Sequence, residues 1–95
     1  MDKLDDRQRE QALERLEEWR AEGEAITRTF HFRDFARAID FVNAVAEMAE
    51  DASHHPDIDI RYNNVKITLT THSVGGITRN DIELAAGIDD LADAA

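Results

Sequence analysis

A tight β-hairpin is the feature of this sequence that most restricts its fold. Two runs of alternating polar and apolar residues, 57–62 and 65–71, are separated only by Asn63-Asn64. Such alternation is typical of half-buried strands, and Asn tolerates the positive φ that a two-residue turn requires. A turn at these two asparagines places Tyr62 opposite Val65, and the apolar residues of the two runs then pair with one another. The pattern therefore predicts an antiparallel hairpin with one buried face.

A second pair of strands and a long helix precede this hairpin. Residues 25–32 alternate in the same way, and Trp19–Ala21 is predicted to pair with them across a turn at Gly23. Asp34 is placed to cap a helix that continues to about Glu50. Apolar residues recur at three- and four-residue spacing along this helix, which predicts a wide face packed against a sheet.

Two further helices complete the predicted fold. Residues 5–18 form a polar helix with a thin apolar stripe, and Thr78 begins the last helix, with Asp81 three residues later in a near capping box. The resulting order is helix, two strands, helix, two strands, helix. It predicts a single α+β domain over residues 1–95, with three helices on one face of a four-stranded antiparallel sheet.

The acidic charge balance of the chain argues against one class of binding partner, nucleic acids. The 95 residues include 11 basic and 21 acidic side chains, a formal net charge of −10, which argues against nucleic-acid binding through a basic face. Only two basic residues are lysines, Lys3 and Lys66, and this bias favours a halophilic, salt-adapted protein over an ordinary acidic one. The chain has no cysteine, which excludes disulfides and thiol chemistry. No apolar stretch is long enough for a membrane span or a signal peptide, so a cytoplasmic location is predicted.

Histidines form the one unusual polar group in the sequence. If the hairpin register continues outward, His55 lies opposite His72, with His54 beside them and Pro56 distorting the ladder. Clustered imidazoles suit proton transfer near neutral pH, and Glu50 could orient one of them. Two other interpretations stay open from the residues alone: a metal site of three histidines with Glu50 as fourth ligand, or a surface group without a role.

Four motifs give the sequence a family resemblance between Trp19 and about Leu91. The motifs are Phe30-His31-Phe32-Arg33-Asp34-Phe35, Glu50 with Ser53-His54-His55-Pro56, Tyr62-Asn63-Asn64-Val65 with Leu69-Thr70-Thr71-His72, and Gly76-Ile77-Thr78 with Asp81. With these motifs the chain resembles the pterin-4a-carbinolamine dehydratases, also called 4a-hydroxytetrahydrobiopterin dehydratases. The resemblance implies removal of water from a 4a-hydroxytetrahydropterin to give a quinonoid dihydropterin. This step recycles tetrahydrobiopterin and uses no metal and no cofactor.

The resemblance also implies roles for individual residues. His54 and His72 would be the proton-transfer pair, and His55, the third histidine of the catalytic set, would bind and orient the pterin. Asp81 can also be only a helix cap, and Glu50 only a solvated helix end. A homodimer or homotetramer is implied as well. Supporting or substrate-binding roles fall on Glu50, Ser53, Pro56, Thr71 and Asp81.

Two departures from the family pattern bear on rate and on the preferred pterin side chain. Ser53 stands where the family often has an acidic residue, and Asn80 stands where it often has Arg. Two alternative functions stand beside the dehydratase. One is a non-catalytic binding, assembly or coactivator-like protein of the same fold, and the other is action on another reduced pterin, such as one in molybdopterin metabolism.

Overall fold

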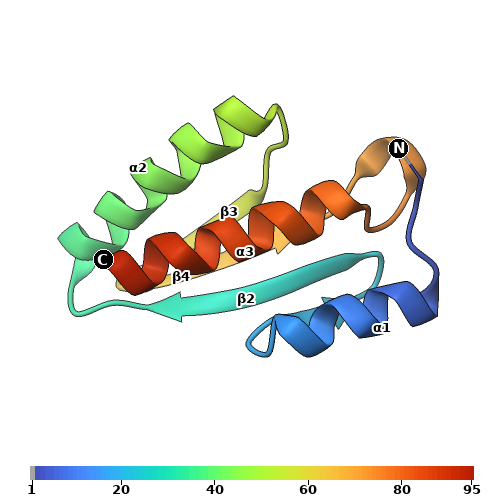
Figure 1. The fold of residues 1–95 in the computed structure, drawn as a ribbon. Helices are drawn as coiled ribbons and strands as arrows, with labels where there is room; N and C mark the ends of the chain where they lie inside the picture. Colours follow the sequence, from blue (N-terminus) through green and yellow to red (C-terminus); the bar gives the residue numbers. More distant parts are fainter. Residues whose placement is uncertain (1) are drawn as a thin grey trace.

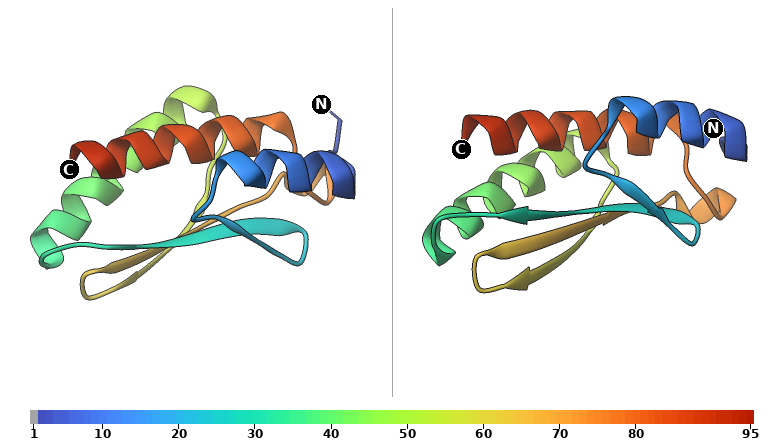
Figure 2. Two further views of the ribbon diagram at one scale, coloured as in Figure 1. Left: turned by 60° about the horizontal axis from the view of Figure 1, so that its bottom comes forward. Right: turned by 90° about the horizontal axis from the view of Figure 1, so that it is seen from below.

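In the computed structural model, which describes residues 2–95, the chain forms a sheet covered by helices. In chain order the elements are α1 (Asp6–Arg15), β1 (Arg20–Glu22), β2 (Ala25–His31), α2 (Phe35–Ala52), β3 (Asp57–Arg61), β4 (Asn64–Leu69), the 3₁₀ turn η1 (His72–Val74) and α3 (Arg79–Ala94) (Figure 1). The four strands are antiparallel in the order β1-β2-β4-β3. All three α-helices lie on one face of the sheet (Figure 2), which confirms the predicted α+β architecture.

Carboxylate caps set where the first two helices begin. The Asp5 side chain accepts the N–H of Gln8 at the start of α1, and Asp34 Oδ1 accepts the N–H of Arg37 at 2.8 Å at the start of α2. The bond to the Arg37 N–H is the main cause that lowers the pKa of Asp34 below its ordinary value, and the charges of Arg37 and Arg33 act in the same direction. Each cap satisfies a backbone N–H that the helix itself leaves without a partner.

The hydrophobic core fills the space between the sheet, α2 and α3. Its members come from one face of β2 and β4 and from the apolar stripes of the two long helices, as alternation and helical spacing predicted. The buried members that these strands and helices contribute include Ile26, Phe30, Val65, Ile67, Leu69, Ala38, Phe41, Val45, Leu84, Ala85 and Ile88.

A polar anchor ties α3 to the sheet beside this core. Trp19 is 4% exposed and donates its indole N–H to Asp89 Oδ1 at 2.8 Å, and Arg28 donates to the same oxygen at 2.7 Å. The Trp19 ring also meets Phe30 edge-on, with ring centroids 6.1 Å apart. Because Asp89 belongs to α3 and Arg28 to β2, these contacts tie the helix to the sheet.

The β3–β4 hairpin forms as predicted, but its turn lies one residue earlier than predicted. The turn residues are Tyr62 and Asn63, and Ile60 therefore pairs with Val65. Asn63 donates its side-chain amide to Phe32 O at 2.7 Å, and its carbonyl accepts the Phe32 N–H at 2.9 Å. These contacts hold Asn63 in the turn and leave Tyr62 with a φ of +53°, which is unusual for an aromatic residue. The shift moves each partner by two positions, so the same residues still share a face.

Other boundaries also differ from the sequence prediction: β1 is Arg20–Glu22 where Trp19–Ala21 was predicted, and α2 continues to Ala52. The first helix, α1, ends at Arg15 rather than at residue 18, because Leu16 and Trp19 turn into the core. Strand β4 ends at Leu69 rather than at residue 71, where the chain leaves the sheet for η1. Within residues 2–95, none of the helices combines the length and apolar character needed to cross a lipid bilayer.

Candidate functional site

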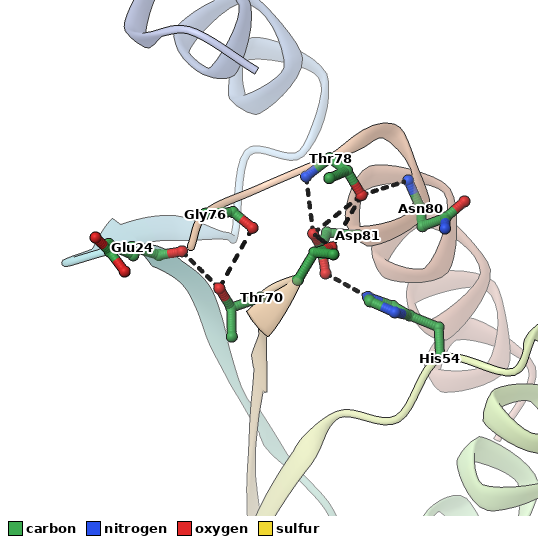
Figure 3. A network of polar contacts seen from close by, with 8 residues as sticks. Glu24, His54, Thr70, Gly76, Thr78, Asn80 and Asp81 are labelled. Atoms are coloured by element: carbon green, nitrogen blue, oxygen red, sulfur yellow. Dashed lines mark hydrogen bonds and ion pairs between the residues drawn. The ribbon is translucent and has the colours of Figure 1, made fainter. Parts of the chain in front are cut away.

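A short loop after β4 brings the first part of the site together. Thr71 donates its backbone N–H to Gly76 O at 2.8 Å, which closes a loop around η1. Gly75 adopts a φ of +67° inside this loop, a conformation that favours glycine. The Thr70 hydroxyl holds the loop against the β1–β2 turn by donating to Glu24 O at 2.8 Å (Figure 3). The loop thereby places Thr71 next to the start of α3.

In the first turn of α3, the fully buried Asp81 carboxylate is surrounded by hydrogen-bond donors. Its Oδ2 accepts the backbone N–H of Thr78 at 2.9 Å and the hydroxyl of Thr71 at 2.7 Å. Its Oδ1 lies 2.5 Å from His54 Nε2 (Figure 3). Asp81 is thus the predicted cap of α3 and also the partner of a histidine, and the donors offset the desolvation of its charge.

The end of α2 directs His54 toward this carboxylate. Ser53 takes a left-handed conformation (φ 51°, ψ 39°). The His54 N–H donates to Ala49 O and the Ser53 N–H to Glu50 O, both at 3.1 Å. These bonds form a Schellman motif, which ends a helix and reverses the chain. After the reversal only 14% of the His54 side chain is exposed.

The neighbouring His55 has a different partner. Its Nε2 contacts Glu50 Oε2, and 63% of the His55 side chain and 74% of the Glu50 side chain are exposed. From the sequence, Glu50 could orient one of the histidines, and the structure places its carboxylate in contact with His55. The two adjacent histidines therefore belong to separate groups, one largely buried and one at the surface.

His72 does not face His55 in the sheet, as an outward continuation of the hairpin register would require; that the two histidines are neighbours stays a prediction. Strand β3 begins at Asp57 and β4 ends at Leu69, so neither histidine lies in the ladder. His72 begins η1 and is exposed, and it makes no side-chain hydrogen bond within residues 2–95. It follows Thr71 directly, so the chain places it beside the loop residue that contacts the buried carboxylate.

The other predicted site residues lie in the connections around these groups. Ser53 ends α2, and Pro56 leads into β3. Thr71 is part of the buried network through its hydroxyl. In the part of the chain that the structure describes, no three His, Asp or Glu side chains are arranged to hold a metal ion.

Sequence reasoning missed the bond between His54 and Asp81 and the contribution of the Thr78 hydroxyl. The Thr-x-x-Asp spacing was already explained by a helix cap, and the hydroxyls of Thr71 and Thr78 lie 2.9 Å apart only because the loop folds back. One signal was available. Asp81 lies in line with the buried stripe of α3 that continues at Leu84, so its acidic side chain is directed inward.

The fold and this pair define a small α+β protein with a site suited to proton transfer. A carboxylate bonded to one imidazole nitrogen fixes the orientation and tautomer of the ring, as acid–base catalysis requires. The second nitrogen is then available to exchange a proton with a bound molecule.

Sequence relatives identify the family. Residues 2–91 match the family model described as Pterin 4 alpha carbinolamine dehydratase. Relatives that carry the family's name include one from Thermomicrobium roseum, 50% identical over 97% of this chain and 99% of its own length. Another, from Nocardia farcinica, is 52% identical over 94% of both chains. The chain belongs to the pterin-4-alpha-carbinolamine dehydratase family, which confirms the resemblance drawn from its motifs.

Solved structures agree with this assignment. A crystal structure of a transcriptional coactivator/pterin dehydratase from Brucella melitensis has a TM-score of 0.93 at 39% identity, covering 96% of this chain and 99% of that one. A pterin dehydratase-like protein described as a RuBisCO assembly factor in the alpha-carboxysome has a TM-score of 0.66 at 25% identity, covering 78% of this chain and 86% of its own. The descriptions of these two proteins thus join the fold to dehydration, coactivation and assembly.

Proposed function

We propose that this chain removes water from a 4a-hydroxytetrahydropterin, the step that recycles tetrahydrobiopterin, by acid–base catalysis at its histidines. The observation that carries the proposal is the 2.5 Å contact between His54 Nε2 and the fully buried Asp81 carboxylate. Family membership supports the substrate class. The relatives from Thermomicrobium roseum and Nocardia farcinica, which are 50% and 52% identical to this chain, both carry the dehydratase name.

The reaction needs one proton donor and one proton acceptor. The C4a–O bond breaks as an acid protonates the departing hydroxyl, which leaves as water. A base takes the N5 proton, and the electron pair of that N–H bond forms the C4a=N5 double bond of the quinonoid dihydropterin. One proton leaves the catalytic groups and one returns to them, so the step consumes no oxidant or reductant, and we propose no metal and no cofactor.

Proton transfer is assigned to His54 and His72, which come from the end of α2 and from η1. Pterin binding is assigned to His55, because its contact with Glu50 leaves most of the imidazole exposed. Supporting roles are assigned to Glu50, Ser53, Pro56, Thr71 and Asp81.

The dehydration rate of a freshly generated 4a-hydroxytetrahydropterin tests this proposal. The parent, His54→Ala and His72→Ala are compared in low salt and in molar KCl, because the acidic composition predicts a benefit from salt. Loss of one general acid or base should lower the rate about 10²–10⁴-fold. His31→Ala is the matched control, because the His31 ring is bonded to Asn64 at the hairpin end of β2. A folded parent that only matches the spontaneous rate in both salts would contradict the dehydratase.

A second candidate is a binding or assembly protein that keeps this fold without turnover. Exposed apolar side chains favour it, since Tyr62 is 67%, Phe35 50% and Ile60 39% exposed. The relative described as a RuBisCO assembly factor gives the same candidate a precedent. It predicts a folded parent that leaves the spontaneous rate unchanged. Parallel assays with pterins that differ in the 6-substituent extend the test to action on another reduced pterin.

We also propose that the chain forms a homodimer or homotetramer. Strand β3 is an edge strand that pairs only with β4, and it carries the exposed Ile60. An unpaired edge offers backbone groups to a second copy of the chain. Light scattering measures the mass of the parent and of Ile60→Lys, and the variant is expected to shift toward the monomer. A monomeric parent would contradict this part of the proposal.

A further inference from the structure

Hydroxyl groups behind Asp81 form a chain of hydrogen bonds whose direction is fixed. The backbone N–H of Asn80 donates to Thr78 Oγ1 at 3.2 Å, and the Thr71 hydroxyl donates to Asp81 Oδ2 at 2.7 Å. A hydroxyl has only one proton to donate. The Thr78 hydroxyl lies 2.9 Å from the Thr71 hydroxyl and 3.5 Å from Asp81 Oδ2. Because Thr71 directs its proton to the carboxylate, the shorter of these two contacts is made when Thr78 donates to Thr71. The chain therefore runs from the backbone of α3 through both hydroxyls to Asp81.

This arrangement leaves one carboxylate oxygen for the histidine. Oδ2 is occupied by the Thr78 N–H and the Thr71 hydroxyl, whereas Oδ1 faces His54 Nε2 at 2.5 Å. Asp81 and Thr78 are both fully buried, so water does not compete for these positions. Since an ionised carboxylate can only accept, Nε2 carries the proton of the neutral His54 imidazole.

The other ring nitrogen of His54 is the one left for chemistry. Nδ1 has no hydrogen-bond partner within residues 2–95. In that range every buried side-chain nitrogen or oxygen atom has a partner, so an atom without one is not buried. Nδ1 is therefore at the accessible surface, in a side chain of which only 14% is exposed.

We propose that the hydroxyls of Thr78 and Thr71 are positioning groups. They hold the Asp81 carboxylate so that His54 keeps its proton on Nε2 and presents Nδ1 to the substrate. The assignment of Nδ1 to the substrate rests on the proposed function, whereas the control of the tautomer does not. If Thr78 were only a helix cap, its oxygen would be sufficient, because that oxygen accepts the Asn80 N–H. The direction in which the Thr78 hydroxyl donates its proton would then have no effect on His54.

Nitrogen-15 spectra of histidine-labelled protein measure the tautomer without any turnover. At a pH at which the imidazole is neutral, the parent is expected to show His54 with a protonated Nε2 and an unprotonated Nδ1. Thr71→Val removes the hydroxyl bonded to the carboxylate but leaves the Thr78 cap, so the two tautomers should become mixed. Thr71→Ser should restore the parental spectrum. Thr29→Val, at an exposed position of β2, is the matched control.

A double-mutant cycle in kcat separates a relay from two independent structural effects. Thr71→Val should lower kcat about 10- to 100-fold, which is part of the general acid–base contribution, with KM changed less than about threefold. Thr78→Val should also lower kcat. Adding it to Thr71→Val should produce little further loss, because its effect passes through Thr71. Because Thr78→Val also weakens the cap of α3, all rates are measured well below the Tm of each variant.

A folded Thr71→Val protein with the parental His54 spectrum would overturn the inference, as would losses in kcat that multiply in the double variant. If the tautomer responds as expected but the parent shows no dehydration, the proposed function fails and the positioning role stands. If the parent dehydrates the pterin and the tautomer does not respond, the function stands and the positioning role fails.

Discussion

The two adjacent histidines of this chain occupy opposite environments. His54 contacts a carboxylate that is fully buried in α3, whereas His55 contacts Glu50, whose side chain is 74% exposed. Both histidines follow the same left-handed residue at the end of α2, and successive side chains on extended backbone point to opposite sides. The first histidine therefore meets the protein interior and the second meets solvent.

The geometry of the buried His54–Asp81 pair depends on residues besides these two. Asp81 is held by Thr71 and Thr78, so the position of its carboxylate does not depend on His54 alone. Glu50 lies on a solvated helix end, where several rotamers are open to its side chain. Exposed ion pairs contribute about 0–1 kcal/mol, whereas breaking a buried one leaves polar groups without partners.

The His54–Asp81 and His55–Glu50 pairs are expected to differ most in their contribution to turnover. Asp81→Asn should lower kcat about 10²–10⁴-fold, because the neutral amide keeps one acceptor oxygen but loses the charge. Its NH₂ group then faces a donor, either His54 Nε2 on one side or the Thr71 and Thr78 donors on the other. Glu50→Gln should act mainly on KM, because its partner His55 is assigned to pterin binding. Stopped-flow dehydration assays measure both constants. Equal losses of kcat in the two variants would remove the distinction between the pairs.

The two pairs should also differ in their contribution to folding stability, by a smaller margin. Asp81→Ala removes the carboxylate half of the capping box of α3 and leaves the Thr71 hydroxyl and the Thr78 N–H without an acceptor, so the free energy of unfolding should fall by about 2–4 kcal/mol. Glu50→Ala should change it by about 0.5 kcal/mol or less. Urea unfolding measures both values. A loss at Glu50 as large as that at Asp81 would show that exposure does not set the strength of these contacts.

The two histidines should also differ in how fast their ring protons exchange with solvent. The Nε2 proton of His54 lies between the ring and a buried carboxylate, so it should exchange slowly enough to give a resolved downfield proton resonance. The corresponding proton of His55 should exchange too fast to be observed. The resonance should disappear in Asp81→Asn and persist in Glu50→Gln. Its survival in His54→Ala would assign it to another group.

The smallest effect is expected at a capping carboxylate that holds no histidine. Asp34 begins α2 as Asp81 helps to begin α3, and its pKa is lowered in the folded protein, chiefly by the Arg37 N–H. A lowered folded pKa means that its contribution to stability is complete above the ordinary carboxyl pKa and is lost as pH falls through the lowered value. Asp34→Asn keeps a capping oxygen but cannot titrate. Thermal melts should therefore show the Tm advantage of the parent shrinking below about pH 4, and a gap independent of pH would contradict this account.

The sequence predicted the elements of the fold more reliably than the contacts between them. Alternation and helical spacing report which face of an element is buried, and they predicted the sheet, the three helices and the caps at Asp34 and Thr78. The hairpin turn is Tyr62-Asn63 and not the predicted Asn63-Asn64. In this turn Asn63 is bonded to Phe32, more than thirty positions earlier in the chain, and local sequence patterns do not report such a contact.

The candidate site was predictable only in part for the same reason. Motif resemblance pointed to His54 and Asp81 separately, but they meet across 27 positions of sequence, where spacing carries no information about contact. The pairing of His55 with His72 came from extending a ladder that in fact ends at Leu69. Alternation in the sequence does not show where β4 ends, because the loop around η1 begins within the same alternating run of residues.

The indole of Trp19 gives the molecule a built-in optical reporter. It is the only tryptophan of the chain, and its N–H is bonded to Asp89 in the same helix whose first turn carries Asp81. The emission of a buried indole changes when its hydrogen-bonded neighbour withdraws, so fluorescence follows the seating of α3 on the sheet. A variant that loses turnover with unchanged emission has lost chemistry at the site, whereas a variant that loses both has lost the position of the helix.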